Sequence, residues 1–222
     1  MTRTRHQFRW LVLLLFASTL VSIRASHAAP GAATITYRRV FKGSSPEFIE
    51  IKVSDQGKST FEIRQLEEDA DAEPFEVGPA VRQKIFDLAA ELKNFAIADL
   101  DVQKKIAYLG QKTFRYERDS EVHEATFNYT INAPANQLAQ IFEGLARQQS
   151  DLVLLERRIK YDRLGVNDAL RQFESDMDHR LLPEPERLLS ALDQIAGDSH
   201  FVEIARTRAR ALAERIRTSR DH

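Results

Sequence analysis

Apolar and polar residues alternate with a period of two in the first part of the chain. This alternation covers Ile35–Tyr37, Ile49–Val53 and Phe61–Ile63. The turn-forming segments Gly43–Pro46 and Asp55–Gly57 lie between these three stretches. The pattern is typical of strands that bury one face, and it predicts three strands joined by two hairpin turns.

A helical pattern follows, and then the whole sequence of elements repeats. Gly78 and Pro79 open a segment whose apolar residues step by three or four, which predicts a helix. Residues 106–109, residues 114–116 and the strictly alternating stretch His123–Ile131 predict further strands. Two strand–helix units in succession favour an antiparallel sheet with the helices on one face.

From residue 134 onward the apolar spacing is helical throughout. The stripe from Leu138 to Ile159 predicts one helix of about 30 residues or two helices that meet near Ser150 and Asp151. Three shorter helices follow, with a helical hairpin at the end to cover the last two apolar stripes. The predicted fold class is therefore α+β: a sheet domain over residues 29–133 and a helical region over residues 134–222, either packed on the sheet domain or separate from it.

The amino end has the pattern of a cleavable signal peptide over residues 1–28. Arg3, Arg5 and Arg9 precede an apolar stretch, Trp10–Ile23, and the small residues around Ala28 and Ala29 follow it. A membrane anchor would need about 20 apolar residues, and this stretch is shorter. We therefore predict cleavage after Ala28, or after Ala29, and a periplasmic or secreted product with no transmembrane anchor after cleavage.

Composition narrows the classes of function. Removal of the leader takes away four arginines and no acids, which leaves 28 basic and 33 acidic residues and a net charge of −5. Such a surface does not favour nucleic acid as a partner. The chain has no cysteine, which excludes disulfides, thiolate catalysis, cysteine-built zinc sites and a lipid anchor on cysteine.

The motifs that commonly carry chemistry are absent from the sequence. It contains no nucleophile elbow, no dinucleotide fingerprint and no phosphate loop. Asp176 and His179 have a spacing that can hold a metal on a helix, but one such pair is too few, and we interpret it as a solvated helical face. Asp69 and Asp71 resemble the start of a calcium loop, which then fails at Pro74. We predict no catalytic residue, no cofactor site and no metal site.

Arginines concentrate in the last predicted helix. This segment suggests a docking surface for an anionic partner, such as an acidic protein, a polyanion or a lipid headgroup. The alternative is that these cations suit the negative end of a helix and flank its apolar stripe. The candidate docking residues are Arg206, Arg208, Arg210 and Arg217.

Three segments resemble parts of exported bacterial proteins. They are Phe41–Phe48, Gly110–Phe114 and Tyr161–Val166. That group of proteins has no known activity, so the resemblance implies a bacterial envelope setting and nothing about chemistry.

Three hypotheses for function follow. The first is a non-enzymatic binding protein of the cell envelope, which engages an envelope protein or an anionic surface. The second is a hydrolase whose groups come from distant positions, with His123, His179 or His200 meeting a carboxylate or a serine in a cleft. The third is a structural protein that self-associates through its helical tail.

Overall fold

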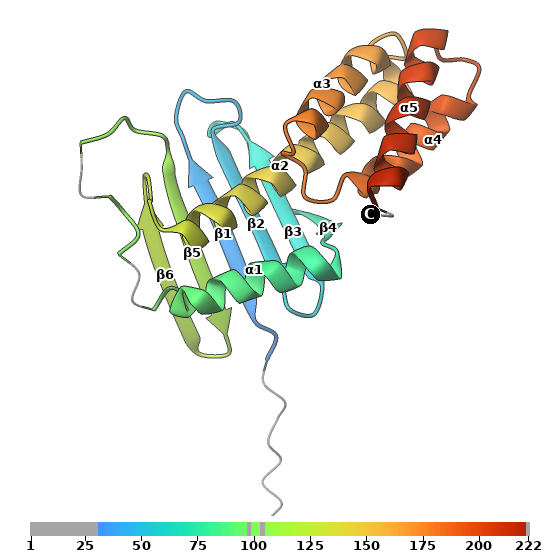
Figure 1. Ribbon diagram of the computed structural model, residues 1–222. Helices are drawn as coiled ribbons and strands as arrows, with labels where there is room; N and C mark the ends of the chain where they lie inside the picture. The colour runs from blue at the N-terminus through green and yellow to red at the C-terminus, as the bar shows by residue number, and fades with distance from the viewer. Residues whose placement is uncertain (1–30, 97–98, 103–104, 221–222) are drawn as a thin grey trace, which may run out of the picture.

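The computed structural model describes residues 31–96, 99–102 and 105–220 and shows an α+β fold, as predicted. The six strands form one antiparallel sheet in the order β4-β3-β2-β1-β5-β6. Two helices lie across one face of this sheet, and the second of them continues into a helical half (Figure 1). The strands are β1 Thr34–Val40, β2 Phe48–Ser54, β3 Lys58–Arg64, β4 Glu73–Glu76, β5 Gln111–Arg118 and β6 Glu121–Phe127. The helices are α1 Pro79–Glu91, α2 Ala133–Tyr161, α3 Val166–Asp178, α4 Leu189–Gly197 and α5 Glu203–Arg220, with 3-10 turns at Lys93–Phe95 and Pro185–Leu188.

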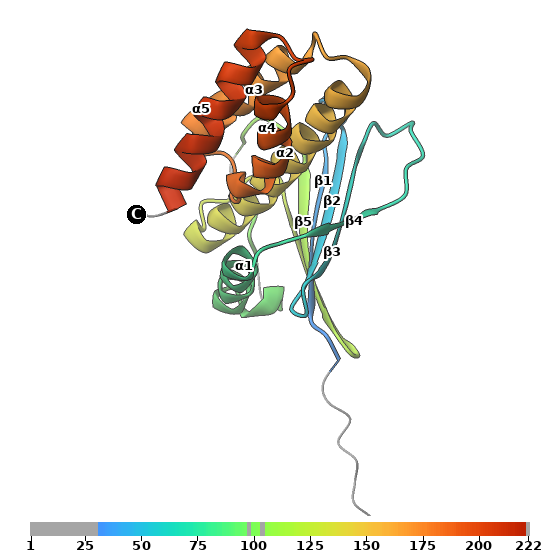
Figure 2. The same ribbon diagram turned by 90° about the vertical axis from the view of Figure 1, so that its right-hand side faces the viewer.

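The two strand–helix units meet in the middle of the sheet. β1 pairs with β2 on one side and with β5 on the other, so the first strand of each unit lies next to the other. Inward residues such as Ile35, Ile51 and Phe114 are fully buried under the helices. Figure 2 shows that α1 and α2 lie on the same side of the sheet, as the period-two pattern predicts for strands that bury one face.

Three predictions about the strands were wrong, at least in part. The stretch predicted from His123 to Ile131 is a strand only as far as Phe127, where β6 ends. Residues 106–109 form no strand: the backbone N–H of Leu109 donates to the side chain of Asn128 instead of to a neighbouring strand. In contrast, Glu73–Glu76 forms an edge strand inside the predicted acidic loop. Phe75 anchors this strand by packing edge-to-face on Phe61, with ring centroids 5.6 Å apart.

The long helix α2 is continuous over 29 residues and belongs to both hydrophobic cores. Its first turns bury Leu138 and Phe142 against the sheet, where the Phe142 ring stacks on Tyr37. Its last turns bury Leu155 in a second core formed with α3, α4 and α5. The helix therefore acts as a rod that connects the sheet half to the helical half.

Further contacts hold the helical half against the sheet half. The backbone N–H of Glu184, at the start of the Pro185–Leu188 turn, donates to the buried side chain of Gln148 at 2.9 Å. Arg187 forms an ion pair with Glu76 on β4 at 2.8 Å. No helix in the described part of the chain is long and apolar enough to cross a membrane.

Candidate functional site

A cleft of about 260 Å³ opens where α2 leaves the sheet and meets α3. Its apolar floor includes Ile49 and Ile63 from the sheet, and the turn between β1 and β2 forms one rim. The opposite wall carries charged and amide side chains from α2 and α3. The polar residues that line the cleft are Arg39, Ser45, Glu143, Arg147, Ser150, Asp151, Gln172 and Asp176.

The polar wall lies at the point where α2 passes from one core to the other. Gln148, Gln149 and Asp151 are all buried there, although the same helix buries apolar residues on both sides of this stretch. Buried polar groups need partners, because an unpartnered buried group costs about 1–3 kcal/mol. The Oε1 atom of Gln148 accepts a hydrogen bond from the segment before α4, whereas the Oδ2 atom of Asp151 has no partner among the described residues.

Two carboxyl groups face each other across α2 and α3. Asp151 is 9% exposed and Asp176 is 3% exposed. The pKa of Asp151 is raised to about 7: burial is the largest cause, the charge of Asp176 and a hydrogen bond to it add to the increase, and Arg147 opposes it. The charge of Asp176 disfavours a second negative charge beside it, so near neutral pH Asp151 is protonated for part of the time.

Both oxygens of Asp176 accept hydrogen bonds from neighbouring side chains, whereas one oxygen of Asp151 has no hydrogen-bond partner among the described residues. One oxygen of Asp176 accepts a hydrogen bond from Arg147 at 3.3 Å, and the other accepts one from the amide of Gln172 at 3.1 Å. The Oδ2 atom of Asp151 is buried and has no hydrogen-bond partner among the described residues. Asp151 is therefore the acid of the pair that is open to an incoming group.

A second network closes the sheet side of the cleft. Glu143 on α2 accepts hydrogen bonds from the hydroxyl of Tyr37 at 2.5 Å and from Arg39 at 2.8 Å. Burial, together with the charge of Glu143, raises the pKa of Tyr37 well above its usual value, so the phenol keeps its proton and donates it. Arg39 also donates to the carbonyl of Pro46, which fastens the rim to the sheet.

The charges of the cleft define the group that it could accept. Glu143 is matched by Arg39 and Asp176 by Arg147, whereas Asp151 forms no ion pair of its own within the described residues. An ammonium or guanidinium group would supply the missing cation and displace the proton. A neutral hydrogen-bond donor would satisfy Oδ2 less strongly, because bonds between charged partners are roughly twice as strong.

The arginines predicted to form a docking surface all make contacts within the helical half. Arg208 binds Glu174 and Asn167 on α3, whereas Arg217 binds Asp193 on α4. Arg206 pairs with Glu203, and Arg210 donates to the carbonyl of Ala196. These contacts hold α5 on α3 from one side and on α4 from the other, in agreement with the alternative that arginines flank the apolar stripe. Whether they also dock a partner remains a prediction.

The three histidines of the hydrolase hypothesis lie outside the cleft. His200 contacts Asp198 at 2.7 Å, but both residues lie on the turn between α4 and α5, where His200 is exposed. His123 stacks on Tyr116, and its Nδ1 is 3.6 Å from Glu121 at the sheet edge. His179 contacts the carbonyl of Ser175 on its own helix.

Neither Asp151 nor Asp176 was predicted from the sequence as part of a site. Asp176 was interpreted as part of a solvated helical face, yet it is buried, because α2 covers it and supplies Arg147. Ser150 and Asp151 were considered only as the meeting point of two helices, the alternative to one long helix. The usable signal was the break in the apolar stripe at Gln148, one turn before Asp151, because polar residues on a buried helical face need tertiary partners.

The predicted signal peptide, with its cleavage positions Ala28 and Ala29, lies outside the described residues. Within the described ranges, no group of three or more His, Asp or Glu side chains is arranged to hold a metal ion. No known protein family matches the chain, and no curated protein shows significant similarity to it.

Proposed function

We propose that this protein is a non-enzymatic binding module of the cell envelope, exported by its leader, whose cleft accepts a cationic group from a partner. The observation that carries the proposal is Asp151: a buried acid beside a second acid, with an unpartnered oxygen and no counter-charge of its own. A cation in the cleft would supply both a hydrogen-bond donor for the unpartnered oxygen and a counter-charge for the carboxylate of Asp151.

The size of the cleft favours a group that projects from a larger partner. Pockets for free small ligands usually measure about 300–1,000 Å³, and this cleft is smaller, at about 260 Å³. Its apolar floor suits the aliphatic stem of an arginine or lysine, with the charged head at Asp151. We therefore infer that the partner is a protein or peptide with an exposed basic side chain.

A direct test uses acetyl-arginine methylamide as the probe and its citrulline counterpart as the neutral control. We expect the arginine probe to shift the NMR signals of α2 and α3 near the cleft, with a dissociation constant on the order of millimolar. Asp151→Asn should remove the effect. Asp87→Asn, on the exposed face of α1 and away from the cleft, is the matched control. Equal binding of citrulline, or unchanged binding by the Asp151→Asn variant, would contradict the proposal.

Proton release gives a second readout of the same site. Near pH 7 Asp151 is about half protonated, so binding of a cation should expel a fraction of a proton. Calorimetry in two buffers with different ionisation enthalpies measures this fraction. We expect it to vanish in Asp151→Asn and to persist in Asp87→Asn.

A second candidate function, hydrolysis, has one observation in its favour. Paired carboxyls that share a proton serve as acid and base in aspartic proteases, and Asp151 and Asp176 form such a pair. The ion pair between Arg147 and Asp176 weighs against this candidate, because Arg147 and the amide of Gln172 already occupy the oxygens of the carboxylate that would activate water. Peptide hydrolysis that is lost in both Asp151→Asn and Asp176→Asn would favour the hydrolase over the binding module.

A further inference from the structure

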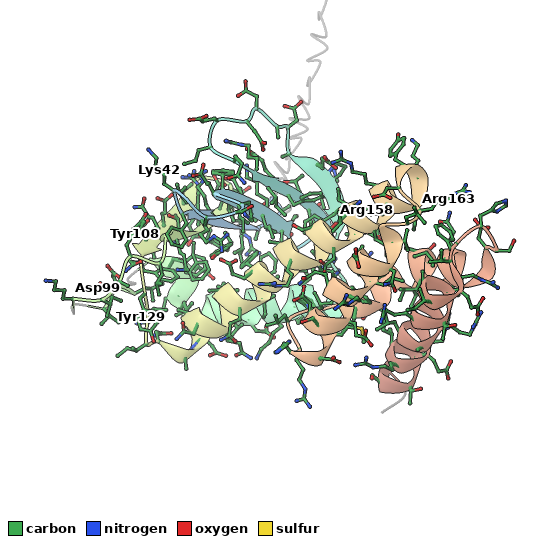
Figure 3. The ribbon with its side chains drawn as sticks, turned by 90° about the horizontal axis from the view of Figure 1, so that it is seen from above. Lys42, Asp99, Tyr108, Tyr129, Arg158 and Arg163 are labelled. Carbon is green, nitrogen blue, oxygen red and sulfur yellow. The ribbon has the colours of Figure 1, made fainter. Side chains whose placement is uncertain are left out.

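A basic and apolar tip lies at the end of the helical half that is remote from the sheet. It is formed by the last turns of α2 and the turn into α3, and we define it by Arg157, Lys160, Tyr161, Arg163 and Leu164. Figure 3 labels Arg158 and Arg163 in this region, at the opposite end of the molecule from Asp99, Tyr108 and Tyr129. The proposed function makes no use of this tip.

Two apolar side chains of the tip project into solvent. Tyr161 is 72% exposed and Leu164 is 79% exposed. Neither contributes to the core of the helical half, which is already closed by residues such as Leu155 and Val166 on either side of them in the sequence. Single exposed apolar residues are ordinary, but here two of them flank one helix end among several cations.

The cations of the tip are largely without counter-charges. Within the described residues, Arg157, Lys160 and Arg163 form no ion pair with a carboxylate, although Glu156 is nearby in the sequence. Asp162, the acid at the helix end, is already occupied by Arg158 and by the backbone N–H of Gly165. Cations at a helix C-terminus are favoured by the helix dipole, but the dipole does not account for the exposed tyrosine and leucine.

Two cations of the tip lie near aromatic rings, and a hollow lies beside them. Lys160 lies 5.0 Å from the ring centroid of Tyr161. Arg163 lies 5.9 Å from the ring centroid of Phe201, and this contact connects the α2–α3 turn to the α4–α5 turn. A hollow of about 330 Å³ is lined by Leu154, Arg157, Arg158, Tyr161 and Asp162. Arg158 in this hollow is paired with Asp162, so the guanidinium group of Arg157 is the one that suits a phosphate, which arginine can bind through two parallel hydrogen bonds.

We propose that this tip docks the protein on a bilayer that contains anionic phospholipid. A lipid phosphate binds at Arg157, while Tyr161 and Leu164 enter the boundary between headgroups and acyl chains. Cations around exposed aromatic and leucine side chains are the usual composition of such peripheral contacts. A bilayer fits better than an acidic protein, because the tip is a projecting helix end and not the broad patch of about 800 Å² that a stable protein interface needs on each side.

Co-sedimentation with vesicles tests the proposal. The protein is purified from its own cells, in the form that occurs there, and mixed with phosphatidylcholine vesicles that contain either none or roughly 30% phosphatidylglycerol. We expect binding to the anionic vesicles only, with a loss of affinity as salt rises, because exposed charges are screened. No binding to anionic vesicles at low salt would overturn the proposal.

Two sets of variants locate the contact. The triple variant Arg157→Gln, Lys160→Gln, Arg163→Gln should lower the affinity about 100-fold, because each basic residue near an anionic surface contributes about 1 kcal/mol. The matched control, Lys42→Gln, Lys58→Gln, Lys84→Gln, removes the same charge from exposed positions of the sheet half and should change little. Equal losses in the two variants would show that only net charge matters and would overturn the proposal.

Apolar insertion and the choice of partner are tested separately. Tyr161→Ser with Leu164→Ser should weaken vesicle binding about tenfold without changing the circular dichroism spectrum, because both side chains lie outside the core. In the Tyr161→Trp variant, the fluorescence maximum of the introduced tryptophan should shift to shorter wavelength when anionic vesicles are added. An unchanged maximum would contradict insertion. Binding to polyglutamate but not to anionic vesicles, with the same dependence on the tip cations, would replace the bilayer by an acidic protein partner.

Discussion

The backbone N–H of Gly78 donates a 2.6 Å hydrogen bond to the side chain of Glu184, 106 residues further along the chain. Gly78 is the residue before α1, and Glu184 lies between α3 and α4. The first helix of the sheet half therefore begins on a side chain from the helical half. Burial raises the pKa of Glu184, while this hydrogen bond opposes the increase.

Loss of this contact should weaken the junction. We expect Glu184→Ala to lower the free energy of unfolding by about 1–3 kcal/mol, because it leaves the amide of Gly78 without its acceptor. Glu184→Gln keeps an acceptor and should lose much less. Urea denaturation measures both, with Glu186→Ala, at an exposed neighbouring position, as the control. If Glu184→Ala and Glu186→Ala were equally stable, the contact would not support the junction.

Gly144 on α2 should not tolerate a side chain. A Cβ atom there would lie 2.6 Å from the carbonyl oxygen of Leu181 and 2.8 Å from Pro183, and neither can move without shifting backbone. We expect Gly144→Ala to destabilise the protein by about 1–3 kcal/mol, although alanine favours a helix interior over glycine by about 1 kcal/mol.

The control for this prediction is Gly197, the last residue of α4. A Cβ atom at Gly197 meets nothing within 4 Å, so Gly197→Ala should be neutral or slightly stabilising. Thermal unfolding followed by circular dichroism compares the two variants. A Gly144→Ala variant as stable as Gly197→Ala would mean that the Leu181–Pro183 segment does not pack on α2 as described.

Asp151 should make stability depend on pH. Its pKa is about 7 in the folded protein, against an ordinary value of 3.8, so the folded state holds a proton that the unfolded state releases between these values. Stability contributed by this group is therefore present at low pH and lost as pH rises through 7. At about pH 8, Asp151→Asn should be more stable than the wild type by roughly 2–4 kcal/mol.

The free energies of unfolding of the wild type and Asp151→Asn should become similar near pH 4. There the carboxyl of Asp151 in the folded protein is neutral, like the amide that replaces it. Urea titrations across this range measure the difference, and Asp87→Asn controls for loss of one surface acid. A constant difference between the wild type and Asp151→Asn at all pH values would contradict the raised pKa of Asp151.

The arginines of α5 should differ in how much each contributes to the stability of the fold. Arg208 is half-buried and binds Glu174 and Asn167, so Arg208→Ala should cost about 1 kcal/mol. Arg217 forms an exposed pair with Asp193, and Arg217→Ala should leave the unfolding midpoint unchanged, because such pairs contribute little. Loss of an anionic partner by Arg217→Ala, without loss of stability, would support the predicted docking surface on α5.

Export can be tested on the protein taken from its own cells. We expect its mass to correspond to a chain that begins at Ala29 or Pro30, after removal of the leader. Ala28→Arg should move the cut or block it, because a small residue is needed at that position. A full-length mass, or folded protein found in the cytosol, would contradict the envelope localisation on which the choice of partners rests.

The sequence by itself determined most of the secondary structure, because burying one face of an element imposes a period on its apolar residues. The alternation at Ile49–Val53 predicted β2, and the stripe from Leu138 to Ile159 predicted α2. The start of α2 also depends only on residues close together in the sequence, because Asn132 caps the helix by accepting a hydrogen bond from the N–H of Ala135. In contrast, β4 was missed, because an edge strand rich in acids and proline has no such period and depends on Phe75 packing on Phe61.

Only the tertiary structure decided what the polar residues do. Asp151 and Asp176 lie on different helices, and only the packing of α3 on α2 brings Asp176 close enough to help raise the pKa of Asp151. The arginines of α5 could have faced a partner or their own helices, and the positions of α3 and α4 supplied internal contacts for them. Burial of one face can be predicted from the spacing of apolar residues within each helix or strand. The pairing of charges, in contrast, depends on which distant segments the fold brings within a few ångströms of one another.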